Sequence, residues 1–343
     1  MVQELMSERP SRGSNEQGSP NNMNYIIVDT ANTFFRARHV VRGDADIKIG
    51  MALHVTLASI KKAWQDFNGS HVVFCLEGRS WRKDFYAPYK RNRSEARAAL
   101  NEKEAEEDKL FWETFDKFKE FIIEKTNCTV LHNPQLEADD LIAGWIDSHP
   151  RDNHIIISTD SDFAQLIAPN VKQYHGINEH IITHEGTFTL KGKPVLDNKT
   201  KQPKGAVDPE WVLFKKCMRG DPTDNVFSAY PKVRENKLLE AFEDRRSKGF
   251  AWNNLMLQRW VDHEGSEHRV LDDYERNKQL IDLKAQPSEI KELITDTIRQ
   301  NSHPKNIEQV GMRLLKFCGL FDLVKVSEQA QQYAEPLNAK YPE

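Results

Sequence analysis

The stretch Leu136–Ile167 reads LEADDLIAGWIDSHPRDNHIIISTDSDFAQLI and decides the fold of this chain. It contains five acidic residues in two short groups, which are Glu137, Asp139 and Asp140, then Asp160 and Asp162. An amphipathic helical pattern follows the first group. The β-branched run His154–Ser158 then precedes the second group, and such a run is typical of a strand buried on both faces of a parallel sheet. The first group therefore starts a helix and the second ends a strand.

The two acidic groups are expected to lie together in space. If the helix returns to the strand in the usual right-handed way, both groups lie at the edge of the sheet where open α/β folds place their sites. Five carboxylates in one crevice would repel one another strongly unless cations lay between them. The stretch therefore predicts a divalent-metal site.

Two further strands end in an acid. The apolar run Tyr25–Val28 is followed by Asp29, and the run His71–Leu76 is followed by Glu77. One such acid is ordinary turn chemistry, since aspartate is common in turns. Three strands that share this ending, together with the group at Glu137, favour a common site.

A third acidic group follows a helix expected to begin at Asp208–Pro209 and to end at Gly220. Asp221 and Asp224 lie in the sequence GDPTDN. The alternative is an Asx-turn or a helix cap that uses one of the two. With this group, the chain offers the all-oxygen ligand set that two hard cations need for phosphodiester hydrolysis.

The most basic stretch of the chain, GRSWRKDFYAPYKRNRSEAR over residues 78–97, directly follows Glu77. Its cations alternate with aromatic residues, a mixture that can hold phosphates and stack bases. The alternative is a solvated loop with a few core aromatics. The position beside Glu77 favours nucleic-acid binding.

The composition is that of a globular protein of about two domains, with 343 residues, 38% hydrophobic and 29% charged. Residues 1–22 are expected to form a disordered extension, and no apolar run is long enough to span a membrane. Four widely separated cysteines fit a reducing, cytoplasmic setting. The chain beyond Val226 is expected to be mainly helical, including residues 252–264.

Several motifs together resemble the flap endonuclease and 5′-3′ exonuclease family, particularly its tailed-phage branch that includes phage ribonuclease H. They are IIVDTANTFFRA, RSWRKDFYAPYKRNR, LEADDLIA, ISTDSDFAQLI and GDPTDNV, in the family's order over roughly residues 24–230. The resemblance implies an α/β fold: a PIN-like nuclease domain over 23–207 with a central, mostly parallel sheet and a helical arch at about 79–109. A mainly helical DNA-binding region of the helix-turn-helix type would follow over 208–343.

The resemblance also implies roles for individual residues. The metal ligands would be Asp29, Glu77, Glu137 and Asp139 for one cation and Asp160, Asp162, Asp221 and Asp224 for the other, with Asp140 supporting both. The catalytic residues would be Lys90, Arg93, Asp29, Asp160 and Asp162. The nucleic-acid contacts would be Phe35, Arg36, Arg82, Lys83, Tyr89, Lys90, Arg93, Lys232, Arg234 and Lys237.

Two features depart from the family pattern. Glu77 stands where the family has aspartate, so its carboxylate reaches one methylene further. No glycine lies between Asp224 and Glu243, where the family has a glycine-rich turn that holds duplex phosphates and a potassium ion. The glycine-free turn argues against a potassium ion in this chain.

The function expected from the sequence is structure-specific hydrolysis of DNA or RNA–DNA near 5′ ends and 5′ flaps, with two Mg²⁺ or Mn²⁺ ions. The protein would act as a monomer in primer removal or repair, in the host cytoplasm if it is encoded by a phage, and would meet single-strand-binding or replisome proteins. One alternative is a PIN-fold ribonuclease acting on single-stranded RNA. The other is a non-catalytic nucleic-acid-binding protein whose acids only cap helices.

Overall fold

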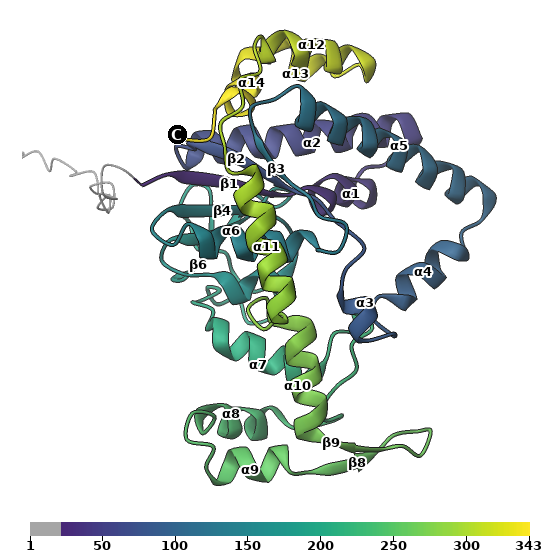
Figure 1. Cartoon of the computed structure of the whole chain (residues 1–343), viewed down its shortest axis with the longest axis vertical. Coiled ribbons are helices and arrows are strands. Elements are labelled where there is room, and N and C mark those ends of the chain that lie inside the picture. The colour runs from purple at the N-terminus through teal and green to yellow at the C-terminus, as the bar shows by residue number, and fades with distance from the viewer. Residues whose placement is uncertain (1–21) are drawn as a thin grey trace, which may run out of the picture.

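The structure, a computed structural model, describes residues 22–343, so the extension expected over residues 1–22 lies almost wholly outside the described residues. A seven-stranded sheet forms the centre of the molecule (Figure 1). Its strands are β1 (Asn24–Asp29), β2 (His71–Cys75), β3 (Thr129–Leu131), β4 (Asn153–Ile157), β5 (Val171–His175), β6 (His180–Thr183) and β7 (Gly186–Thr189).

The sheet is parallel over its first five strands, which confirms the expected mostly parallel sheet. The strand order is β3-β2-β1-β4-β5-β6-β7, and only the pairs β5–β6 and β6–β7 are antiparallel. Asp29 of β1 pairs with Cys75 of β2, and Val28 pairs with Ile157 of β4. The chain reverses its direction of winding between β1 and β4, which is the place where open α/β sheets leave a crevice beyond the strand ends.

Helices cover both faces of the sheet. The first half of the chain contains α1 (Thr30–Val40), α2 (Ala45–Asp66), α3 (Arg82–Phe85), α4 (Arg91–Ala98), α5 (Glu102–Glu124), α6 (Ala138–Ser148) and the 3₁₀ turn η1 (Ser161–Leu166). Because side chains alternate along a strand, Ile26 and Val28 pack with α1, α2 and α5, whereas Tyr25 and Ile27 pack with α6.

The second half of the chain is mainly helical. It contains α7 (Pro209–Arg219), the short turn η2 (Pro222–Asp224), α8 (Glu235–Glu243), α9 (Phe250–Met256), α10 (Val270–Ile281), α11 (Ser288–Asn301), α12 (Val310–Leu320), α13 (Val324–Glu328) and α14 (Ala330–Asn338). Figure 1 shows α10 rising from the distal end, formed by α8 and α9, toward α11. The last helices return to the first half, where Leu314 and Leu337 join the same apolar core as side chains of α2 and α5.

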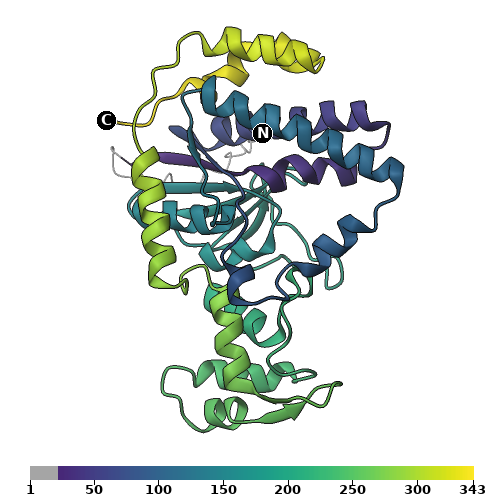
Figure 2. The ribbon, with the colours of Figure 1, turned by 45° about the vertical axis from the view of Figure 1, so that its right-hand side comes forward.

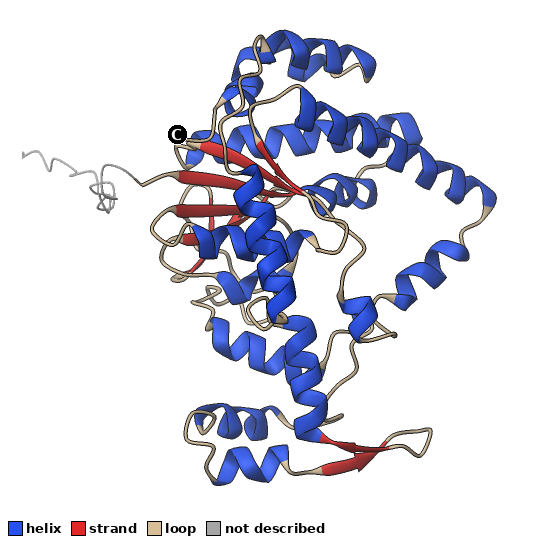
Figure 3. Cartoon of the chain, viewed as in Figure 1, coloured by secondary structure: helices blue, strands red, loops and turns tan. Residues whose placement is uncertain are grey.

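The helix expected over residues 252–264 is wrong in its second part. Helix α9 ends at Met256, and a hairpin of β8 (Arg259–Val261) and β9 (Glu267–Arg269) follows, shown in red in Figure 3. Asp262 accepts hydrogen bonds from the backbone N–H groups of Glu264 and Ser266, and Gly265 has a φ of 86°. This turn chemistry reverses the chain before the helix can continue.

The basic stretch leaves the body of the molecule and returns to it. Helices α3 and α4 stand away from the sheet, and the long α5 returns along it (Figure 2). Helix α5 begins with a capping box between Asn101 and Glu104. No helix within residues 22–343 is long and apolar enough to cross a membrane.

Candidate metal centre

A pocket of about 490 Å³ lies beyond the carboxyl ends of β1, β2 and β4. Seven carboxylates line it, and they are Asp29, Glu77, Glu137, Asp139, Asp160, Asp162 and Asp224. Five cations line the same pocket, and they are Arg79, Lys83, Lys90, Arg93 and Arg97. The structure therefore brings together the strand-end acids and members of all three acidic groups.

Ser158, the residue after β4, connects two of the strand ends. Its hydroxyl donates to Asp29 Oδ2 at 2.7 Å and accepts from the backbone N–H of Asp160 at 3.0 Å. Asp160 Oδ1 then accepts from the N–H of Asp162 at 2.9 Å, which caps η1. The ends of β1 and β4 are thus held together by one hydroxyl group, whose importance could not be inferred from its position in the sequence.

Glu77 uses its extra methylene to reach the start of α6. Its Oε2 accepts a hydrogen bond from the backbone N–H of Ala138 at 3.2 Å, at the helix N-terminus where an anion is favoured. Loss of bulk water around the carboxylate, with Glu137 and Asp29 nearby, nevertheless raises the pKa of Glu77 to about 7 against the lowering effect of Lys90.

Glu137 is buried and strongly paired. Arg82 Nη1 lies 2.7 Å from its Oε2, and the Lys90 ammonium group contacts its Oε1. Burial alone would raise the pKa of Glu137, but the charges of Lys90 and Arg82 outweigh it and lower this pKa to about 2. Glu137 therefore remains ionised in the structure.

Asp140 does not line the pocket, and its expected role as a metal ligand stays a prediction. It is fully buried, and its two oxygens accept hydrogen bonds from Arg82, Trp81, Gln286 and the backbone of Glu137. One oxygen of each of Glu137, Asp139 and Asp140 lies within 4.8 Å of the others. The oxygens of Asp140 are nevertheless occupied by protein donors, so Asp140 is a structural neighbour of the centre.

Two expected nucleic-acid contacts, Arg82 and Tyr89, are also buried. Arg82 is 0% exposed, and Tyr89 is 4% exposed. The Tyr89 hydroxyl group donates to Glu137 Oε2 at 3.0 Å and can also reach Asp224 Oδ2 at 3.2 Å. In this structure neither side chain is open to a base or a phosphate, and their contacts with nucleic acid stay predictions.

Cationic side chains from two helices pair with the third acidic group. The ammonium group of Lys216 on α7 contacts Asp162 and lies 2.8 Å from Asp221 Oδ2, and Arg93 pairs with Asp224. Although burial opposes it, the hydrogen bond from Lys216 lowers the pKa of Asp221. Lys216 was not predicted as a site residue from the sequence. Its position five residues before Asp221 was a usable signal that the two side chains could pair. Asp221 also forms the Asx-turn considered as an alternative, since it accepts from the N–H of Thr223 at 2.9 Å.

The surroundings of Asp29, Asp139 and Asp162 disfavour their negative charge, and a nearby cation would offset this effect. Burial raises the pKa of Asp29 to about 7 and that of Asp162 to about 6. Burial, together with Glu137 and Asp140, raises the pKa of Asp139 well above its ordinary value. An all-oxygen set of crowded carboxylates fits hard divalent cations and offers no soft ligand.

The other expected nucleic-acid contacts lie in three places. Phe35, Lys83, Lys90 and Arg93 line the acidic pocket, while the exposed Arg36 lies beside the loop after β4. The exposed residues Lys232, Arg234 and Lys237 lie at the glycine-free turn before α8 and on that helix. Lys232 has a φ of 61°, so a lysine adopts the left-handed conformation that glycine would take more easily.

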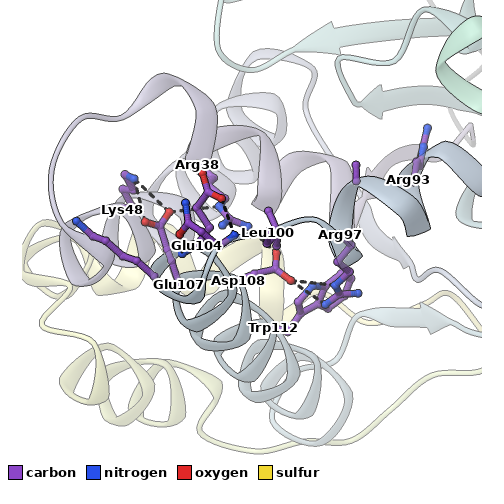
Figure 4. A pocket seen from close by; sticks show the side chains of 12 residues that line it. Arg38, Lys48, Arg93, Arg97, Leu100, Glu104, Glu107, Asp108 and Trp112 are labelled. Carbon is purple, nitrogen blue, oxygen red and sulfur yellow. Dashed lines mark hydrogen bonds and ion pairs between the residues drawn. The ribbon is translucent and has the colours of Figure 1, made fainter.

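A second pocket, of about 930 Å³, lies between α4, α5 and the start of α2, and it shares Arg93, Arg97 and Trp112 with the acidic pocket. Figure 4 shows its ion pairs. Lys48 Nζ lies 3.1 Å and Arg38 Nε 3.3 Å from Glu107, and Arg38 Nη1 lies 2.7 Å from Asp108. These pairs join α5 to α1 and α2.

The fold and the acidic pocket together define a PIN-like α/β domain with a carboxylate centre beyond its parallel strands. Residues 24–192 match the family described as 5′-3′ exonuclease, N-terminal resolvase-like domain. Residues 24–192 are therefore similar to that family.

Individual relatives agree with this assignment. The chain is 28% identical to ribonuclease H of Enterobacteria phage T4 over 59% of its own length and 60% of the relative. The structure is similar to a phage T5 5′-exonuclease with bound zinc, with a TM-score of 0.57, 19% identity and coverage of 81% of this chain and 99% of the other. A bacteriophage T5 flap endonuclease in complex with DNA and metal ions has a TM-score of 0.52 and 18% identity, covering 91% of this chain and 99% of the other. The first curated relatives are matched over about 60% of their length.

Proposed function

We propose that this chain is a metal-dependent nuclease that hydrolyses phosphodiesters at 5′ ends and 5′ flaps of DNA or RNA–DNA duplexes. The observation that carries the proposal is the acidic pocket, in which carboxylates from three parallel strands and three acidic groups are bordered by a rim of cations. Removal of RNA primers and trimming of flaps during replication or repair are the roles that match this substrate class. The similarity to T4 ribonuclease H supports this choice.

Two divalent cations, Mg²⁺ or Mn²⁺, fit the site. One group of ligands would be Asp29, Glu77, Glu137 and Asp139, and the other Asp160, Asp162 and Asp224, with Asp221 reached only if Lys216 withdraws. When bound, such cations activate water and neutralise charge on the phosphate. The pKa values near 7 of Asp29 and Glu77 support this reading, because these carboxylates gain most from a nearby positive charge.

The protein's own cations have a separate task. Lys90 and Arg93 lie on the rim between the acidic pocket and the basic segment, and each is paired with a carboxylate of the centre. Cations bound at the centre would take over these carboxylates and free Lys90 and Arg93 to hold the scissile phosphate. Their charge would stabilise the negative charge that develops on the phosphate and the leaving oxygen. Lys83 and Arg97 line the same pocket and would hold neighbouring phosphates.

One assay tests the proposal against its rivals. Labelled 5′-flap, nicked and RNA-primed duplexes, and a single-stranded RNA, are incubated with Mg²⁺, Mn²⁺ or a chelator. We expect metal-dependent cleavage of the flap and of the RNA-primed duplex. Preferential cleavage of single-stranded RNA would favour the ribonuclease alternative, and binding without cleavage in any metal would favour the non-catalytic one.

A further inference from the structure

Helix α10 ends beside the acidic centre, and its last carbonyl groups accept hydrogen bonds from that centre. Arg82 Nε donates to the carbonyl of Leu280 at 2.8 Å, and Gln165 Nε2 donates to the carbonyl of Ile281 at 3.0 Å. The last carbonyls of a helix have no partner within the helix. Side chains from the neighbourhood of the acidic residues therefore cap α10, and the positive charge of Arg82 suits a helix C-terminus.

Residues 282–287 connect α10 to α11, and we call this connection the elbow. The elbow donates two more hydrogen bonds to the neighbourhood of the acidic residues. The backbone N–H of Leu283 donates to Gln165 Oε1 at 2.9 Å, and Gln286 Nε2 donates to Asp140 Oδ1 at 3.1 Å. Gln165 belongs to η1, the turn that carries Asp162. Asp140 belongs to the first acidic group and lies in the first turn of α6. The elbow is therefore bonded to the segments that carry both acidic groups of the stretch 136–167.

Helix α10 also holds the third acidic group. Asn277 is fully buried, and its Nδ2 donates to the carbonyls of Cys217 and Phe227 at 2.8 and 2.7 Å. These two carbonyls lie on either side of the turn that carries Asp221 and Asp224 in the sequence. One helix and the elbow after it therefore contact the segments that carry all three acidic groups, from a part of the chain that supplies no carboxylate to the pocket.

We infer that α10 and the elbow are the positioning element that sets the spacing of the three acidic groups. Gln165, Asn277 and Gln286 are positioning residues, because they do not line the pocket and act through η1, the turn after α7 and Asp140. The inference rests on the proposed function, since the spacing of the carboxylates matters for the cations they would hold. Polar side chains that hydrogen-bond to neighbouring segments in this way help to keep a site rigid.

A purely stabilising role for these contacts predicts different behaviour. If the elbow only added stability, loss of one hydrogen bond would lower the midpoint of unfolding and leave local motion at the acidic groups unchanged. If the elbow positions the groups, the start of α6 and η1 should become locally mobile while the sheet stays protected. Local opening is measured by amide hydrogen exchange.

The first experiment uses the full chain without metal or substrate. Gln286→Leu and Gln165→Leu are compared with Gln300→Leu, an exposed glutamine on α11 that serves as the control. We expect amides of residues 137–142 in Gln286→Leu, and of 160–166 in Gln165→Leu, to exchange about tenfold faster than in the parent, with β1 unchanged. Gln286→Asn, which keeps the amide but shortens the side chain, should show the same effect in a more conservative variant. Unchanged exchange in both segments would overturn the inference.

The second experiment measures turnover on the labelled flap. We expect Gln286→Leu to lower kcat by about tenfold with KM within about twofold, because small misplacements of reacting groups reduce rate more than binding. A wild-type chain that cleaves nothing would reject the proposed function, and the exchange experiment would still decide the positioning role. Normal kcat in a variant with fast local exchange would overturn the claim that the spacing matters for the reaction.

Discussion

Arg82 and Asp140 are both fully buried and are joined by two hydrogen bonds of 2.9 and 2.8 Å, a paired geometry that matches the planar guanidinium group to the carboxylate. This pair fixes the first turn of α6 against the basic stretch. It leaves Asp139, the preceding residue, to line the acidic pocket. Asp140 is therefore paired with a buried cation, whereas its neighbour Asp139 faces the acidic pocket. Neutralising each of them should have a different effect on stability.

Asp140→Asn should destabilise the protein by about 3–5 kcal/mol, because it leaves Arg82 charged, buried and without its main partner. Asp139→Asn should leave stability unchanged or higher, because burial and nearby acids already disfavour its charge. Urea denaturation of the metal-free proteins measures both changes. Asp139→Asn should nevertheless lose cleavage. An equal loss of stability in the two variants would contradict this assignment.

Asp160→Asn and Asp162→Asn should each abolish cleavage and leave DNA binding measurable, because the basic rim of the pocket is untouched. Cleavage of a labelled flap and a binding titration in the presence of a chelator separate the two properties. Asp116→Asn, an exposed position on α5, provides the matched control. Unchanged turnover in the two variants would end the assignment of the metal centre.

Lys90→Ala should slow cleavage and reduce the salt dependence of DNA binding by about one unit of slope, the amount expected for one phosphate contact. The comparison is Lys109→Ala, a lysine on α5 whose side chain is 76% exposed. Binding is titrated at several salt concentrations for each protein. If the salt dependence of binding has the same slope in Lys90→Ala as in the parent, Lys90 does not contact a phosphate.

The stabilising effect of Mg²⁺ should grow with pH. Burial raises the pKa values of Asp29 and Glu77 to about 7, so the folded metal-free protein keeps protons that the unfolded chain releases near pH 4. Its free energy of unfolding therefore falls, as far as these groups contribute, while the pH rises from about 4 to about 7. A divalent cation replaces the protons.

Thermal unfolding with and without excess Mg²⁺ at pH values from about 5 to about 8 tests this pH dependence, and the gain in Tm should be largest at the upper end. The buried His71 and His154, whose pKa values burial lowers to about 4, titrate alike in both series and cancel in the difference. A gain in Tm that does not change with pH would count against carboxylates of raised pKa as the ligands.

Glu107→Gln should tighten nucleic-acid binding severalfold and steepen its salt dependence. Glu107 pairs with both Arg38 and Lys48, so its neutralisation removes one negative charge and frees Lys48 to meet phosphates, while Arg38 keeps its pair with Asp108. Glu113→Gln, on an exposed part of the same helix, is the control. Affinities that match the parent at every salt concentration would show that the pocket of Figure 4 stays outside the nucleic-acid path.

Sequence patterns predicted the parallel sheet and the convergence of its acids, because both depend on local rules. Asp29, Glu77 and Asp160 follow buried strands, and parallel strands bring their carboxyl ends to one edge. The side of the protein that a polar residue faces does not follow from such rules. Arg82 resembled its exposed neighbours in sequence, yet its Nε partner is the carbonyl of Leu280, which lies 198 residues away.

The β8–β9 hairpin was missed for a related reason. Trp260 fits the apolar spacing of the preceding helix, and its indole N–H donates to the carbonyl of Ala229 at 2.9 Å, a contact that exists only after the distal region has folded. The turn sequence around Gly265 was a local signal for the reversal and outweighs helical spacing in this segment.

Helices α12 and α14 pack against the first half of the chain, and this has a consequence for the order in which the protein folds during synthesis. Asn127, next to β3, binds the backbone carbonyls of Ile307 and Asn338, and Leu337 is fully buried under α2 and α5. A ribosome must therefore have made residues 310–337 before the apolar face of the family domain at 24–192 is covered. Nascent chains shorter than this would expose that face, so chaperone binding during synthesis should persist until these helices emerge.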